Sequence, residues 1–108
     1  MLIDLTQVYV NSDDTPALTG DTRQPITLRF MLVQALLAES PNVSTEEKIK
    51  RYSLFRDIKK AGDTIELPVE DIAVLKRAAT IFSTLVMGQT HEMLERAAAP
   101  DTASLGLS

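Results

Sequence analysis

The most apolar stretch of the chain is residues 27–38, TLRFMLVQALLA, which only Arg29 and Gln34 interrupt after the first threonine. At 100° per residue, neither polar position shares a face with Glu39, so the stretch has no wide polar side. Its length and its Leu, Met, Ala and Gln content favour a helix over a strand. The pattern predicts a central helix that is buried on several sides, with Thr27 as its N-cap.

The next segment carries clear signals for both ends of a helix. Ser44 precedes two glutamates, and Glu47 at the third helical position can reach back to the Ser44 amide in a capping box. Basic residues fill the last turn, and Gly62 suits the position just beyond a helix end. These signals predict a second helix over about residues 45–61.

One face of this second helix is predicted to be buried. Apolar residues recur there at helical spacing, namely Ile49, Tyr52, Phe55 and Ile58, with Leu54 beside them. Two acid–base pairs four residues apart, Glu46–Lys50 and Glu47–Arg51, have the orientation that stabilises a helix.

The N-terminal part of the chain predicts β structure. Residues 2–10 are rich in β-favouring side chains, and after a polar turn residues 17–19 are expected to pair back as a short second strand. Residues 63–68 alternate in polarity and are expected to add an edge strand. The predicted inward positions of the first strand are Ile3, Leu5 and Tyr9.

The last third of the chain predicts two more helices with a break at residues 83–84. Pro68 leads into the third helix, and Thr84 is placed to cap the fourth. Gly88 within the fourth helix is expected to permit a close helix approach. The small residues and proline of the last eleven positions, 98–108, predict a flexible tail.

Together these elements predict a mainly helical α+β fold. We expect an N-terminal β-hairpin packed on a bundle of about four helices, followed by a flexible C-terminal tail. A chain of 108 residues is sufficient for one domain, so residues 1–97 are predicted to form a single globular domain and 98–108 the tail.

Composition and charge narrow the function classes. Hydrophobic residues make up 44% of the chain, which is typical of a globular protein, and the absence of cysteine excludes disulfides and thiolate ligands. The N-terminus lacks the basic region of a signal peptide, and no apolar run approaches the roughly 20 residues of a membrane span, so we expect no membrane association. A net charge of −4 argues against general nucleic-acid affinity.

The strongest polar feature is a basic cluster in the second predicted helix. Its members are Lys48, Lys50, Arg51, Arg56, Lys59 and Lys60. Such a cluster in an acidic protein can dock on phosphates or on an acidic protein surface. It can equally be a solvated helix face with internal ion pairs, which is the simpler interpretation, and both stay open.

Candidate chemical groups are few. His91 is the only histidine, no cysteine accompanies it, and Glu92 and Glu95 offer at best a helical His/Glu set. We therefore interpret His91 as a partly exposed helical residue. The chain also contains no Gly-rich phosphate loop and no G-x-S-x-G motif. We expect neither an enzyme nor a bound cofactor or metal.

Acidic residues form two small groups. Asp13, Asp14 and Asp21 lack the alternating acids, central glycine and terminal glutamate of a calcium loop, so turn formation is the better explanation. Glu70 and Asp71 are neighbours at a predicted helix start, where adjacent side chains diverge and where acids interact favourably with the helix dipole.

The order of several segments resembles a group of small proteins encoded by tailed bacteriophages and prophages. The segments are DLT at 4–6, TLR at 27–29, STEEKIKRY at 44–52, IELPVEDI at 65–72 and LVMGQ at 85–89. The resemblance covers roughly residues 1–95 and assigns no site residues. It implies a protein of the infected bacterial cytoplasm that is in some cases incorporated into the virion.

These observations predict a non-enzymatic protein that acts by protein–protein interaction. The resemblance favours a role in virion or tail assembly, with a second copy or a phage structural protein as partner. The alternative is an inhibitor or regulator of a host nucleic-acid-processing or defence complex, with a host protein as partner and direct nucleic-acid binding not expected.

Overall fold

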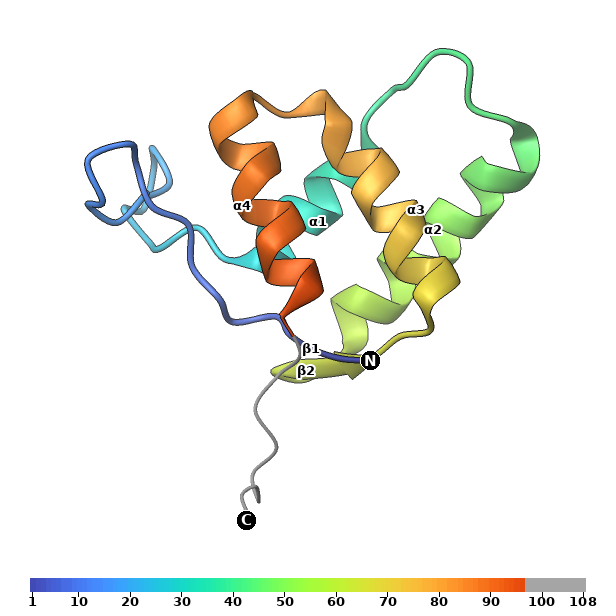
Figure 1. Ribbon diagram of the computed structural model, residues 1–108, viewed down its shortest axis with the longest axis horizontal. Helices are drawn as coiled ribbons and strands as arrows, with labels where there is room; N and C mark the ends of the chain where they lie inside the picture. Colours follow the sequence, from blue (N-terminus) through green and yellow to red (C-terminus); the bar gives the residue numbers. More distant parts are fainter. Residues whose placement is uncertain (97–108) are drawn as a thin grey trace, which may run out of the picture.

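The computed structural model describes residues 1–96 (Figure 1). Its elements in chain order are β1 (Leu2–Asp4), α1 (Leu28–Leu37), α2 (Thr45–Lys60), β2 (Thr64–Glu66), α3 (Val69–Ala78), the 3₁₀ turn η1 (Ala79–Ile81) and α4 (Thr84–Glu95). The predicted mainly helical α+β class, with antiparallel pairing at the N-terminus and four α-helices, is confirmed. The tail predicted at 98–108 lies outside the described residues.

The sheet joins two segments that are distant in sequence. β1 pairs antiparallel with β2, so that Ile3 lies opposite Ile65, which confirms that the 63–68 segment adds to the N-terminal strand. The regular strand ends at Asp4 because its Oδ1 accepts hydrogen bonds from the Thr6 amide at 2.8 Å and the Thr6 hydroxyl at 2.6 Å, which turns the chain. The three predicted inward positions are nevertheless all buried: Ile3, Leu5 and Tyr9.

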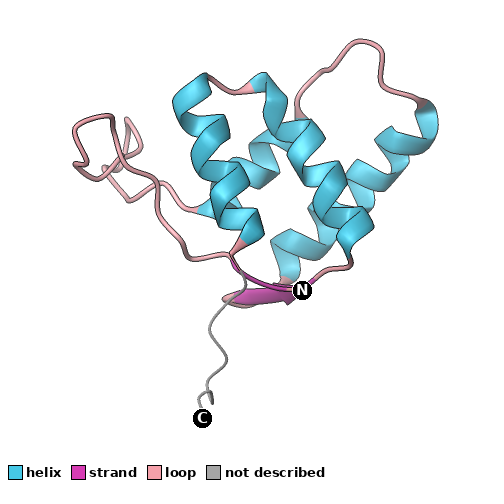
Figure 2. Cartoon of the chain, viewed as in Figure 1, coloured by secondary structure: helices cyan, strands magenta, loops and turns pink. Residues whose placement is uncertain are grey.

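Residues 5–27 form an arm that projects to one side of the helices and is drawn mainly as loop in Figure 2. The return strand predicted at residues 17–19 does not form as a regular strand: Val10 makes an isolated antiparallel bridge with Pro16, and Leu18 bridges Pro25 instead of the N-terminal segment. A continuous ladder does not form here because neither proline has an amide proton to donate. The Tyr9 hydroxyl bonds the buried Thr90 hydroxyl at 2.5 Å and so anchors the arm to α4.

Helix α1 crosses the middle of the molecule and begins as predicted, with the Thr27 hydroxyl accepting from the Phe30 amide at 3.2 Å. Its buried residues form one stripe: Leu28, Leu32, Ala35 and Leu36. The prediction that α1 is buried on several sides is wrong, because Phe30 is 44% exposed and Leu37 55% exposed. The apolar residues of α1 therefore form two separate surfaces, a buried core stripe and an exposed apolar face.

Helix α2 begins at the predicted cap, with the Ser44 hydroxyl accepting from the Glu47 amide at 3.1 Å, but the Glu47 carboxylate bonds Arg51 and Arg77 and does not complete the predicted capping box. The predicted buried stripe is wrong at Ile49, which is 64% exposed, and at Tyr52, which is 54% exposed, whereas Leu54 and Ile58 are buried as predicted. The residues that α2 buries are Arg51, Leu54 and Ile58. Helix α2 is thus rotated relative to the prediction, and a charged side chain occupies a core position.

The C-terminus of α2 is capped from another helix. Gly62 does not adopt the left-handed conformation expected beyond a helix end. Instead the Arg29 guanidinium of α1 donates to the carbonyls of Ile58 at 2.6 Å, Ala61 at 2.9 Å and Gly62. A cation at a helix C-terminus also interacts favourably with the helix dipole. Arg29 therefore replaces the glycine cap that the sequence suggested.

Helices α3 and α4 meet at the predicted break. η1 follows α3 directly, and the Ser83 hydroxyl caps α4 by accepting from the Val86 amide at 3.5 Å, one residue before the predicted cap Thr84. The close approach expected at Gly88 is wrong, because a methyl group built there would have no atom within 4 Å. Within residues 1–96, no helix is both long and apolar enough to cross a membrane.

Candidate functional site

The basic cluster of α2 is divided between two environments. Lys50 pairs with the buried Asp71 of α3 at 2.8 Å, and this hydrogen bond and charge raise the pKa of Lys50. Arg51 is buried and pairs with Glu47 at 2.9 Å. The remaining four side chains are exposed, namely Lys48, Arg56, Lys59 and Lys60. Arg51 is therefore buried in an ion pair on its own helix, and Lys50 is held toward α3.

Glu47 is the centre of a network that joins α2 to α3. Its carboxylate accepts from the Arg51 guanidinium on its own helix and from Arg77 of α3, at 2.8 Å and through a second oxygen–nitrogen contact at 3.1 Å. The hydrogen bond from Arg77, followed by that from Arg51, holds the pKa of Glu47 below its ordinary value of 4.5. The paired carboxylate is what allows the Arg51 charge to be buried.

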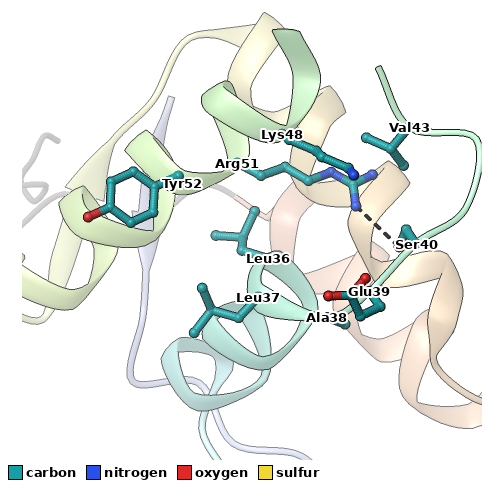
Figure 3. Close-up of a pocket in the computed structure, with 9 residues that line it drawn as sticks. All are labelled: Leu36, Leu37, Ala38, Glu39, Ser40, Val43, Lys48, Arg51 and Tyr52. Atoms are coloured by element: carbon teal, nitrogen blue, oxygen red, sulfur yellow. Dashed lines mark hydrogen bonds between the residues drawn. The ribbon is translucent and has the colours of Figure 1, made fainter. Parts of the chain in front are cut away.

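A pocket opens between the end of α1 and the start of α2, with a volume of about 190 Å³ (Figure 3). One wall is apolar and is formed by Leu36 and Leu37 of α1 and Tyr52 of α2. The other wall is polar, and there Arg51 Nη1 lies 3.4 Å from the Ser40 hydroxyl. The complete lining is Leu36, Leu37, Ala38, Glu39, Ser40, Val43, Lys48, Arg51 and Tyr52.

From this pocket an apolar surface extends along both helices. On α1, Phe30, Val33 and Leu37 follow one another at three- and four-residue spacing on the side away from the buried stripe. On α2, Tyr52 and Phe55 are neighbours with ring centroids 6.0 Å apart. Leu37 and Tyr52 line the same pocket, so the two halves are continuous. We call these five residues the α1–α2 strip.

Basic side chains border the α2 half of the strip. The Arg56 guanidinium lies 5.9 Å from the centre of the Tyr52 ring, and the Lys59 ammonium lies 5.6 Å from the centre of the Phe55 ring. Both distances are within the range of cation–π attraction. Lys48 lines the pocket at the other end of the same helix. The strip is thus an apolar surface with a cationic edge.

The comparisons with known proteins identify no relative. No protein-family model matches this chain, and no curated protein or solved structure matches it significantly. The resemblance to small phage proteins therefore stays a prediction, and the geometry of the site has to carry the functional argument.

His91 lies on α4 and is partly buried, as the sequence suggested. Within residues 1–96 its buried Nε2 has no hydrogen-bond partner. The neighbouring Glu95 is occupied by Lys76 of α3, at 2.9 Å, and this bond lowers the pKa of Glu95. The predicted His/Glu set therefore lies on one helix, but the Glu95 carboxylate is bound in an ion pair with Lys76.

The acidic residues at 13–21 and at 70–71 also have structural roles that the structure shows. Asp13 Oδ1 accepts from the Thr15 hydroxyl at 2.6 Å and from the Thr15 amide at 3.1 Å, and these bonds lower the pKa of Asp13. This is the turn geometry that the sequence indicated. Asp71 is buried against Lys50, whereas Glu70 is exposed, so the pair diverges. No group of three or more metal-ligating side chains gathers within the described part of the chain.

The sequence reasoning missed two features of the site. It placed Tyr52 in the core, and it did not identify which residues of the strongly apolar α1 face outward. A signal for the true orientation of α2 was present, because Glu47, Arg51, Leu54 and Ile58 also follow helical spacing and begin with an ion pair. The contact of Glu47 with Arg77, thirty positions later, has no local signature.

Proposed function

We propose that this chain is a non-enzymatic protein that acts by binding another protein through the α1–α2 strip. The observation that carries the proposal is the exposure of large apolar side chains on adjacent helices, above all Leu37 and Tyr52. Continuous exposed apolar surfaces of this kind are uncommon on monomeric proteins and mark interaction sites. Residues at three- and four-residue spacing on one helix are typical anchors of helix-mediated contacts.

The remaining polar groups support a binding role over a chemical one. The two carboxylates that are partly or fully buried on α2 and α3 are held in ion pairs, Glu47 with its two arginines and Asp71 with Lys50. A catalytic site needs a nucleophile or base within hydrogen-bond reach of its activating group in a cleft. The pocket at the strip offers the Ser40 hydroxyl and the Arg51 guanidinium, and its one carboxylate, Glu39, is exposed and makes no hydrogen bond to Ser40 within the described residues.

The resemblance to small phage proteins supplies the biological context of the proposal. An exposed apolar strip is compatible with the protein–protein contacts that an assembly role requires. We therefore propose virion or tail assembly in the infected bacterial cytoplasm as the process, with a second copy or a phage structural protein on the strip.

A second candidate follows from the exposed cations of α2. Lys48, Arg56, Lys59 and Lys60 lie on the outward part of this helix, and a regulator of a host nucleic-acid machine would use them at the phosphates or at an acidic surface of that machine. The net charge of −4 opposes this role at long range, because nucleic acids attract basic proteins. We rank it second for that reason.

The experiment that tests the first proposal is site-specific photocrosslinking in cells that produce the protein. A photoreactive phenylalanine analogue replaces Leu37 or Phe30 on the strip, and in the matched control it replaces Ile81, which is exposed to a similar extent on η1. We expect a discrete protein adduct from both strip positions and none from position 81. Light scattering of the purified protein then shows whether the partner is a second copy.

Two outcomes contradict the proposal. Absence of an adduct from both strip positions means that the strip faces only solvent. Equal adducts from the strip and from position 81 mean that the protein is adhesive without a defined face. Leu37→Glu separates binding from folding, because a charge at a position that is 55% exposed leaves the core intact and removes an anchor.

A further inference from the structure

The α1–α2 strip has a strongly asymmetric border, and this asymmetry specifies the chemistry of what it binds. On the α2 side, three exposed cations lie next to Tyr52 and Phe55, with Lys48 at the pocket, Arg56 over one ring and Lys59 over the other. Residues 48–56 of α2 include no Asp or Glu. Asp57 is seven residues after Lys50 and so lies on the same side of α2 as Lys50, which pairs with Asp71 of α3.

The acids of α2 are turned away from the strip. Glu47 lies on the inward face and is neutralised by two arginines. Glu39 is the one carboxylate in the lining of the pocket and stands at its end, beyond the last turn of α1. A partner that covers the strip therefore meets apolar side chains along its centre and three positive charges along one edge.

We propose that the strip binds an amphipathic helix of a partner protein, with acidic residues on the side of that helix that faces α2. The inference rests on the proposed function and deepens it by specifying the partner chemistry. A helix fits because the α1 anchors Phe30, Val33 and Leu37 repeat at helical spacing, and a facing helix presents apolar residues with the same period. Acidic residues fit because they complement the cationic edge and prevent like-charge repulsion there.

The structure favours a protein over a nucleic acid as the occupant. The exposed apolar area of Leu37 and Phe30 on α1 has no cation beside it on its own helix other than Arg29, which is bonded to the α2 carbonyls. Phosphates contact only the cationic edge and leave the α1 half uncovered. An acidic amphipathic helix covers both halves of the strip.

Peptide binding to the full chain tests the proposal directly. The probe is a fluorescent 20-residue peptide. Leu residues repeat at i, i+3, i+4 and i+7 to form the apolar face of a helix, and Glu residues line one side of that face. A matched peptide carries Lys in place of every Glu, and a third has the acidic composition in scrambled order. Fluorescence anisotropy at about 50 and 200 mM salt measures the three affinities. We expect the acidic amphipathic peptide to bind about tenfold or more tightly than either control, and less tightly as salt screens the edge.

Variants assign the binding to the two parts of the strip. Leu37→Glu should weaken binding about tenfold or more, because it removes a central apolar anchor and places a carboxylate near acidic residues. The double variant Lys48→Glu with Lys59→Glu should bind the acidic peptide more weakly, and this binding should depend less on salt. The same variant should bind the basic peptide more tightly. Lys76→Glu is the control for each of the two single substitutions, since it makes the same change of charge at an α3–α4 ion pair outside the strip. Circular dichroism confirms that each variant is folded.

The remaining outcomes separate this inference from the proposed function. A concentration-dependent dimer that Leu37→Glu abolishes, without peptide binding, overturns the acidic partner and leaves a protein-binding strip occupied by a second copy. Tighter binding of a 20-base-pair DNA than of the acidic peptide, lost in the Lys48/Lys59 double variant, overturns the inference in favour of phosphates. No binding of peptide, DNA or a second copy, together with no photocrosslink, overturns both.

Discussion

Replacement of Glu47 by alanine is the most informative perturbation of this fold. The substitution removes the carboxylate that bonds Arg51 at 2.9 Å and Arg77 at 2.8 Å. The Arg51 side chain is only 7% exposed, and without Glu47 its remaining contact is the Ser40 hydroxyl at 3.4 Å. Its Nε already lacks a hydrogen-bond partner within residues 1–96. Glu47→Ala therefore leaves a buried positive charge without compensation.

The magnitude follows from the two arginines separately. Breaking a buried ion pair by removal of one partner costs about 3–5 kcal/mol. The Arg77 side chain is 54% exposed, so the loss of its half of the network adds at most about 1 kcal/mol. We expect the free energy of unfolding to fall by about 3–5 kcal/mol, and the midpoint of thermal unfolding by roughly 12–20 °C for a chain of this size. Urea unfolding followed by far-ultraviolet circular dichroism measures the change.

Two companion variants test the reasoning. Glu46→Ala removes an exposed first-turn glutamate of the same helix and should cost less than about 1 kcal/mol. Glu47→Leu combined with Arg51→Met replaces the pair by apolar groups and should recover most of the lost stability. A cost for Glu47→Ala no larger than that for Glu46→Ala would refute the claim that the network supports the buried arginine.

The same network makes a prediction about pH. The pKa of Glu47 is lowered on folding, so its contribution to stability is complete above the ordinary value of 4.5 and is lost as the pH falls through the lowered value. The wild-type protein should lose stability below about pH 4.5, and Glu47→Gln should lose less over the same range. Parallel pH profiles of the two proteins would contradict this assignment.

Three further substitutions probe separate parts of the fold by the same unfolding assay. Arg29→Ala removes the bonds to the last carbonyls of α2 and should cost about 1.5–3 kcal/mol, whereas no loss would mean that water replaces the guanidinium. Leu32→Ala empties a fully buried position of α1 and should cost about 2–5 kcal/mol; a change well below 1 kcal/mol would contradict the core assignment. Gly88→Ala adds a methyl group where nothing lies within 4 Å, on a helix, and should stabilise the protein by about 0.4–1 kcal/mol, so that destabilisation would place an unseen neighbour there.

The sequence was sufficient for features that depend on near neighbours along the chain. The Thr27 and Ser44 caps, the extent of α2 and the interruption before α4 follow from local hydrogen bonding, and all are present. The antiparallel addition of residues 64–66 to the N-terminal strand was also recognisable from its alternation. These features required no knowledge of what packs against them.

The features that failed depend on partners remote in sequence. The spacing of apolar residues in α2 was compatible with burial of either of two helical stripes. The stripe that contains Arg51 is the buried one because Arg77 of α3 pairs with Glu47 on that side. The end of α2 offered a glycine, yet Arg29 from α1 capped it. The exposed residues Phe30 and Leu37 are chemically indistinguishable from core residues, so only the packed arrangement reveals the strip.

The cap that Arg29 supplies affects the kinetics with which the strip binds a partner. Helices α1 and α2 are fastened to each other at both ends, by Arg29 at the end of α2 and by the Arg51–Ser40 contact beyond the end of α1. The spacing between the two helices is therefore set before any encounter. A preorganised surface sacrifices little conformational freedom on association. The rate of complex formation should then be governed by collision and electrostatic steering, with no slow rearrangement of this chain.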